Sequence, residues 1–252
     1  MTGRHTNLGL LSALLVAFAT GWIAFAAGTG WARPVVVIHG IAGLAVVALA
    51  PWKSVIARRG LRKKRKGKPS SVFLAVLVVV SLAAGIAHSL AGVRAVGGLT
   101  IMQVHVGAAV AAVPFSIVHL VRRPTPLRRT DLSRRNLLRG LGVLGGGALI
   151  YGALEGLSSL VALPGSARRF TGSHERGSHE PERMPVTQWL NDSVPAINAA
   201  RWSLQVRSGG DVRRWSLDEL VQLEGPLTAT LDCTGGWYSV QDWAAVPLRL
   251  VL

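Results

Sequence analysis

The sequence predicts a membrane all-α helical bundle with five transmembrane helices, followed by a small α+β domain. Three observations predict this fold class. Half of the 252 residues are apolar, five apolar runs approach or reach the length that crosses a bilayer, and all twelve carboxylates lie from Asp131 onward. The basic residues of the first half cluster between the apolar runs. Despite the net charge of +16, they therefore indicate membrane topology, and we expect contact with the lipid bilayer and no nucleic-acid partner.

The five spanning segments divide the chain into three domains. Residues 1–130 are expected to form a four-helix module, 131–163 the fifth helix, and 164–252 the α+β domain. The first segment carries no charge inside and is long for a cleaved signal peptide, so we expect an uncleaved helix. The four helices of the module are expected at Asn7–Ala27, Pro34–Pro51, Val72–Ala91 and Thr100–Val121.

The distribution of Lys and Arg among the loops predicts the orientation. The loop at 53–68 carries nine and the stretch 122–139 carries seven, whereas 28–33 and 92–99 carry one each. Because basic loops tend to stay in the cytoplasm, we expect the N-terminus inside and the C-terminal domain outside. The predicted localisation is that of a multi-pass protein of the plasma membrane.

Arg134 and Arg135 stand directly before the fifth apolar run. A paired arginine ahead of a long apolar segment has the form of a twin-arginine export signal, here in mid-chain. The alternative is ordinary basic flanking of a membrane helix. The motif alone does not decide between these two interpretations.

Alternating patterns predict strands in the C-terminal domain. Residues 202–215 read as a β-hairpin that turns at Gly209-Gly210. Ser216 and Glu219 form a capping box that opens a short helix. Residues 227–233 alternate again and predict a strand that ends at the single cysteine of the chain.

Four histidines fall within the apolar runs: His39, His88, His105 and His119. Ionisable side chains at membrane depth are costly and are functional candidates by default. The first three lie near the outer ends of their helices, whereas His119 lies about 21 Å from His105 along the same helix and about 40° around it. This spacing predicts one or two haem b groups with histidine ligands, the outer one better supported. The alternatives are hydrogen bonds across small-residue helix contacts, a proton relay or another metal.

Three other motifs have a more ordinary interpretation. Residues 140–145 match GxGxxG but lie inside an apolar run, so helix packing is expected rather than a dinucleotide site. The repeated Gly-Ser-His-Glu at 172–175 and 177–180 is expected to form a polar loop. Glu155 is the one carboxylate of the fifth span and indicates a contact with a neighbouring helix or a position near the outer interface.

Cys233 is the strongest candidate for a functional side chain in the C-terminal part. A lone cysteine on a strand is usually a small apolar side chain. Here, however, Thr234-Gly235-Gly236 follows at once and allows close backbone approach to whatever the sulfur holds. We expect Trp237, Tyr238 and Trp243 to wall a pocket.

The stretch from Leu231 to Tyr238, with Trp243 and Val246-Pro247-Leu248, resembles the cofactor loop of the sulfite oxidase-like molybdopterin-dependent oxidoreductases. Three upstream segments are similar to the part of the same family's domain that precedes the cofactor loop. They are Phe170-Thr171-Gly172-Ser173, Met184-Pro185-Val186 and Ser216-Leu217-Asp218-Glu219-Leu220. The resemblance implies that Cys233 supplies the thiolate to molybdenum. It also implies molybdopterin contacts, which we assign to Thr234, Gly235, Phe170, Thr171, Gly172 and Ser173.

The first four helices resemble the cytochrome b-like modules that precede such domains in membrane-bound members. This implies a membrane-bound oxidoreductase that couples an extracytoplasmic molybdopterin site to b-type haem, with quinone or a cytochrome as electron partner. A domain that folds around its cofactor in the cytoplasm would need the twin-arginine export machinery, which favours the export reading of Arg134 and Arg135.

The sequence departs from that family at its end, because the family's catalytic domain continues well beyond this loop, whereas the chain stops at Leu252. We therefore expect a partial sulfite oxidase-like domain, either C-terminally truncated or completed by another chain. The alternative function is a non-catalytic membrane haem protein or anchor whose soluble part does not hold molybdenum. A helical membrane protein with purely structural histidines is the third hypothesis.

Overall fold

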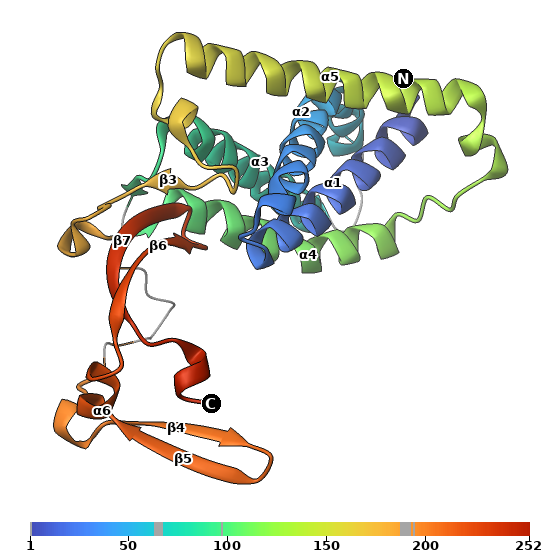
Figure 1. Cartoon of the computed structure of the whole chain (residues 1–252). Helices are drawn as coiled ribbons and strands as arrows, with labels where there is room; N and C mark the ends of the chain where they lie inside the picture. The colour runs from blue at the N-terminus through green and yellow to red at the C-terminus, as the bar shows by residue number, and fades with distance from the viewer. Residues whose placement is uncertain (1, 63–67, 97, 187–192, 194) are drawn as a thin grey trace. The chain divides into compact units, whose positions relative to one another are not determined.

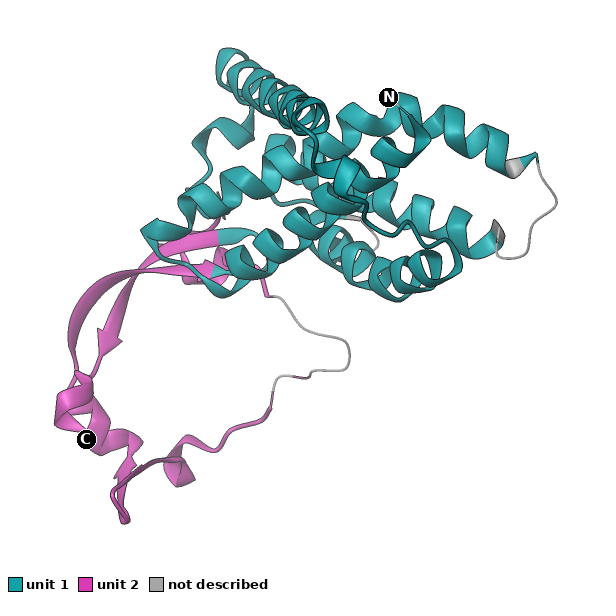
Figure 2. Ribbon diagram, turned by 90° about the vertical axis from the view of Figure 1, so that its right-hand side faces the viewer, with its two compact units in different colours: residues 1–174, 233–237 teal, residues 175–232, 238–252 magenta. Residues whose placement is uncertain are grey.

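The computed structural model describes residues 2–62, 68–96, 98–186, 193 and 195–252. The chain forms two compact units, coloured separately in Figure 2. Unit 1 comprises residues 1–174 together with 233–237, and unit 2 comprises residues 175–232 together with 238–252. Part of the basic run expected in the loop at 53–68 lies outside the described residues.

Unit 1 contains five helices that are long and apolar enough to span a membrane. They are α1 (Gly3–Ala26), α2 (Arg33–Leu61), α3 (Lys68–Ala91), α4 (Ile101–Arg122) and α5 (Arg134–Leu160). The expected five apolar helices, followed by a small sheet region, are confirmed. Large apolar side chains such as Leu15, Trp22 and Val79 lie exposed on the helix surfaces, which suits lipid as the surrounding solvent.

α2 is longer than its apolar run, because it continues past Pro51 to Leu61. A proline inside a helix removes one backbone hydrogen bond. Membrane helices tolerate this because nearby polar groups take up the freed carbonyls. The carbonyl left without its amide donor is that of Val47, four residues earlier. In the next turn the Ser54 hydroxyl donates to the carbonyl of Pro51 at 2.8 Å.

The helices of unit 1 pack as antiparallel neighbours (Figure 1). α1 pairs with α2, so that Lys53 Nζ donates to Asn7 Oδ1 at 3.0 Å near the start of α1. α3 pairs with α4, with the rings of Phe73 and Phe115 4.8 Å apart. α5 packs along α2.

The α2–α5 contact depends on Gly147, where the two backbones meet. A Cβ atom at this position would lie 2.6 Å from the carbonyl oxygen of Ile41 and 2.9 Å from the amide nitrogen of Ala45. The expected packing role of the glycines at 140–145 is wrong, because nothing described lies within 4 Å of a Cβ built at Gly140, Gly142 or Gly145. The motif is inside a helix, as expected, but its three glycines make no close contact with the described residues.

Short elements connect the helices. The hairpin of β1 (Ala95–Val96) and β2 (Leu99–Thr100) leads into α4, which Thr100 and Gln103 close with a reciprocal capping box. The 3₁₀ turns of unit 1 are η1 (Gly30–Ala32), η2 (Arg129–Leu132) and η3 (Pro164–Ala167).

Unit 2 carries most of the small sheet region. β6 (Gly225–Cys233), β7 (Trp237–Ala245) and β3 (His174–Glu175) form a sheet of order β3-β7-β6. β4 (Ser203–Ser208) and β5 (Asp211–Ser216) form the expected hairpin, with positive φ at both Gly209 and Gly210. The expected short helix is α6 (Leu217–Val221), and its capping box is present. The 3₁₀ turns are η4 (Pro181–Arg183), η5 (Ala199–Arg201) and η6 (Leu248–Leu250).

Candidate functional site

Two of the four membrane histidines form a close pair in unit 1. The rings of His39 on α2 and His105 on α4 have centroids 5.8 Å apart and stand at 85° to one another. Each ring rests on a glycine of the neighbouring helix. A Cβ at Gly21 would lie 3.0 Å from His39 Cε1, and a Cβ at Gly85 would lie 2.9 Å from His105 Nδ1.

Hydrogen bonds fix the same tautomer in both rings. His39 Nδ1 lies 2.7 Å from the carbonyl oxygen of Ala17, and His105 Nδ1 lies 2.7 Å from that of Ser81. A carbonyl oxygen can only accept, so each Nδ1 carries the proton and donates it. Nε2 is then the unprotonated nitrogen of both rings. This is the arrangement of metal-ligating histidines, whose other nitrogen donates to a backbone carbonyl or a carboxylate.

The centroid separation of this pair, taken alone, is compatible with two imidazole ligands of one haem iron. Imidazole–metal bonds of about 2 Å put the centroids of two opposing rings roughly 6 Å apart, close to the 5.8 Å separation of His39 and His105. Among the described residues, no group of three or more His, Cys, Asp or Glu side chains is arranged to hold a bare ion. Haem needs only the axial pair, since the porphyrin supplies the other ligands.

His119 lies at the opposite end of the α3–α4 pair. Its Nδ1 is 3.1 Å from the hydroxyl oxygen of Ser71, near the start of α3. Lys53 and Arg123 are the charged groups that interact with it. The contacts of His119 therefore join it to a hydroxyl and two cations, rather than to a second imidazole.

Cys233 ends β6 and begins a tight turn to β7. The Gly236 amide donates to the Cys233 carbonyl at 3.0 Å, and the Gly235 amide lies 3.4 Å from the sulfur atom. The thiol is free and half-buried, and the following Trp237 is 4% exposed. We call residues 233–237 the cysteine turn. The turn belongs to unit 1, so the sulfur lies with the helices rather than with the rest of its hairpin.

The cysteine turn rests on His88 of α3. Gly236 has φ +85°, and a Cβ there would lie 2.5 Å from His88 Cε1 and 2.7 Å from Nε2. His174 stands beside them, with its ring centroid 4.8 Å from that of His88 and the planes at 86°. His174 Nε2 bonds to the His88 carbonyl at 2.9 Å, and the His174 amide donates to the Gly236 carbonyl at 3.1 Å. One small cluster therefore joins the helix end, the cysteine turn and the start of β3.

The segment before β3 adds a second turn to this cluster. The Arg169 amide donates to the Ser173 carbonyl at 2.8 Å, and the Gly172 amide donates to the Arg169 carbonyl at 2.9 Å. Thr171 Oγ1 and Ser173 Oγ lie 3.3 Å apart, and the Arg169 guanidinium lies 5.0 Å from the centre of the Phe170 ring. Through His174, residues 170–173 reach the cysteine turn, about 60 positions along the chain.

The expectation of a polar loop is wrong for the first Gly-Ser-His-Glu copy. His174 is 5% exposed and lies in β3, whereas His179 of the second copy is exposed and bonds Asp242 Oδ2 at 3.1 Å. The sequence offered no local signal for the difference, since the two copies are identical. Trp243, expected to wall a pocket at the sulfur, lies in unit 2 and donates from Nε1 to the Ala229 carbonyl at 3.1 Å.

Glu155 near the end of α5 pairs with Arg168, which follows η3. The same guanidinium donates to the carbonyls of Ser89, at 3.2 Å, and Gly165, at 2.9 Å. The single carboxylate of α5 thus anchors the chain after the fifth helix to the end of α3. Tyr151, one turn earlier on α5, lies within electrostatic reach of Glu155 and Arg168.

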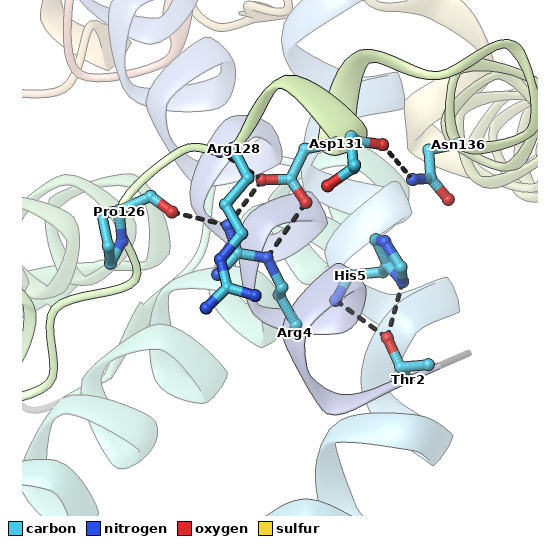
Figure 3. A network of polar contacts seen from close by, with 8 residues as sticks. Thr2, Arg4, His5, Pro126, Arg128, Asp131 and Asn136 are labelled. Atoms are coloured by element: carbon cyan, nitrogen blue, oxygen red, sulfur yellow. Dashed lines mark hydrogen bonds and ion pairs between the residues drawn. The ribbon is translucent and has the colours of Figure 1, made fainter.

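The segment that leads to Arg134 and Arg135 begins beside the first turn of α1. Arg4 donates from Nε to Asp131 Oδ1 at 3.0 Å and from Nη2 to Asp131 Oδ2 at 2.5 Å (Figure 3). Nη2 also donates to the Pro126 carbonyl. The Arg128 amide donates to the same carboxylate at 2.8 Å. Arg4, followed by the Arg128 amide, holds the pKa of Asp131 at about 2, below its ordinary value of 3.8. Arg134 and Arg135 themselves are exposed at the start of α5.

Apart from the hydrogen bonds of His39 and His105, polar contacts gather at the two opposite ends of the helices of unit 1. Arg4–Asp131, Lys53–Asn7 and Ser71–His119 join one set of helix ends. The contacts of His88 with His174 and of Arg168 with Ser89 join the other set. The basic segments and the cysteine turn therefore lie at different ends of the helices.

The fold and these contacts define a class of protein: a chain with five candidate membrane-spanning helices, a close histidine pair between them, and a cysteine turn seated at one helix end. Comparisons with protein-family models, curated proteins and solved structures found no match.

Proposed function

We propose that this chain is a membrane-bound oxidoreductase in which haem b, held by His39 and His105, exchanges electrons with a molybdopterin cofactor at Cys233. The proposal is carried by one observation, the short path between the histidine pair and the cysteine turn. His105 packs on Gly85 of α3. His88 lies three residues further on the same helix, about 4.5 Å along its axis, and touches Gly236 of the turn.

The chain's own residues hold and orient the two groups in this proposal. The Ala17 and Ser81 carbonyls fix the Nδ1–H tautomer of the paired histidines, which would leave Nε2 as the nitrogen able to bind iron. Cys233, at the end of a strand and in a turn with two glycines, would provide the thiolate. The cofactors supply the electron chemistry itself, and the protein supplies ligation and burial.

The orientation and the partners follow the same proposal. The ends that carry Arg4, Lys53 and Arg134-Arg135 face the cytoplasm, because basic segments are retained there. The cysteine turn then lies outside, and the twin-arginine machinery exports the domain already folded. Quinone or a cytochrome is the electron partner.

Absorbance of isolated membranes tests the haem part. A reduced-minus-oxidised spectrum is expected to show a b-type α-band that His39→Ala and His105→Ala each abolish. His119→Ala is the matched control, since it removes an imidazole at the other end of α4, and it is expected to keep the outer haem. A flat spectrum in the unaltered chain would end the haem proposal.

Elemental analysis tests the molybdenum part independently. Purified chain is expected to contain molybdenum, and Cys233→Ser to lose it while keeping its haem absorbance. Molybdenum that is absent from the unaltered chain, or unchanged by the substitution, contradicts the catalytic reading. Haem without molybdenum would favour the alternative, a membrane haem protein that does not act on a molybdenum substrate.

A further inference from the structure

His88 is buried in a way that needs explanation. Its side chain is 3% exposed, and among the described residues neither ring nitrogen has a hydrogen-bond partner. The Gly172 backbone approaches the ring without reaching hydrogen-bond geometry. Buried polar groups are nearly always paired, so the contacts that place this imidazole are the packing contacts of its ring.

The surroundings of His88 differ from those of the other outer histidines. His39 and His105 have Nδ1 fixed by a carbonyl, and Nε2 is their unprotonated nitrogen. The Nε2 edge of His88 instead faces Gly236, at 2.7 Å from where a Cβ would stand, and no carbonyl fixes its tautomer among the described residues. The cysteine turn therefore lies against this edge of the ring.

Several features show how closely the turn and the ring fit. Gly236 has φ +85° and would bring a Cβ into the ring, so glycine is required there for both its backbone and its size. Met102 Cε, at 3.1 Å from the same point, closes the turn from α4. His174 holds the arrangement from the side, with its amide on the Gly236 carbonyl and Nε2 on the His88 carbonyl.

We infer that His88 is not a haem ligand but a positioning residue, the seat by which α3 fixes the cysteine turn. Its ring sets the position of Gly236, and Gly236 lies three residues from Cys233 in a turn closed by the Gly236–Cys233 hydrogen bond. The unpaired nitrogens leave the imidazole able to bond a polar group bound at the turn. The statement about haem rests on the proposed function, whereas the statement about the turn does not.

Because the chain has a single cysteine, the effect of His88 on the cysteine turn can be measured as the rate at which Cys233 is alkylated. Full-length chain in native membranes, from cells grown without molybdate, is treated with N-ethylmaleimide, which can label only Cys233 among cysteines. His88→Ala is expected to speed alkylation about tenfold or more, because the turn loses its seat. His88→Phe restores a planar ring of similar width and is expected to return the rate to within about threefold of the unaltered chain. His119→Ala is the control and should leave the rate unchanged.

The b-type absorbance of the same membranes separates the two roles. His88→Ala is expected to keep the absorbance that His39→Ala and His105→Ala lose. Loss of absorbance in His88→Ala would make His88 a ligand and overturn the inference. An unchanged alkylation rate in His88→Ala would overturn it as well. If the unaltered chain shows no haem, the proposed function fails, and alkylation still decides whether His88 seats the turn.

Discussion

Replacing Gly147 by alanine is expected to force α5 away from α2. The added Cβ would stand 2.6 Å from the Ile41 carbonyl oxygen and 2.9 Å from the Ala45 amide nitrogen. Both are backbone atoms of a helix and cannot rotate aside. Overpacking of this kind costs about 1–3 kcal/mol, while alanine gains at most about 1 kcal/mol over glycine in helix propensity. With the full gain counted, the expected result is a net loss of up to roughly 2 kcal/mol in the free energy of unfolding.

Gly142→Ala provides the matched control for this prediction. It is the same substitution in the same helix, and nothing described lies within 4 Å of the added Cβ. Thermal denaturation of the two purified variants in one detergent is the assay. Gly147→Ala should melt at a lower temperature than the unaltered chain, and Gly142→Ala at the same or a slightly higher one. Equal melting temperatures for the two variants would refute the close backbone contact between α2 and α5.

Three further substitutions test the ends of the helices and unit 2. The pKa of Asp131 is held at about 2, so its stabilising pairing is complete above the ordinary pKa near 4 and is lost as the pH falls toward 2. The difference in melting temperature between the unaltered chain and Asp131→Asn should shrink from about pH 5 to about pH 2, and a difference independent of pH would contradict the ion pair. Ser216→Ala removes the N-cap of α6 and should destabilise that helix by about 1 kcal/mol, measured by faster amide exchange in its first turn; unchanged exchange would mean that the cap contributes nothing. Changing Arg134 and Arg135 to lysine should leave the C-terminal domain inside the cell, and protease added from outside that still digests it would exclude twin-arginine export.

The helices and local turns could be predicted because their causes are local. A bilayer-length apolar run becomes a helix wherever it stands, since its backbone groups must be paired within the segment. The capping box at Ser216 and the hairpin turn at Gly209-Gly210 depend on neighbours three residues apart or fewer, and both are present. The extension of α2 beyond Pro51 was not predicted, because the apolar run ends there whereas the helix continues through basic residues to Leu61.

The candidate site was predicted only in part, because depth along a helix is readable and rotation around it is not. Counting residues set His39, His88 and His105 at one level. Only packing shows that two of them pair and that the third turns toward Gly236, nearly 150 positions later in the chain. The burial of His174 has the same cause, since its partners come from α3 and from the cysteine turn.

The ion pair between Arg4 and Asp131 also has a consequence for the order of events during synthesis. The two residues are 127 positions apart, and α1 to α4 lie between them. The pair cannot form until the chain has been synthesised past α4, because Asp131 follows α4 in the sequence. Arg134 follows Asp131 by only three residues. The pair can therefore form only after α1 to α4 have been synthesised, at the point in the chain where α5 begins.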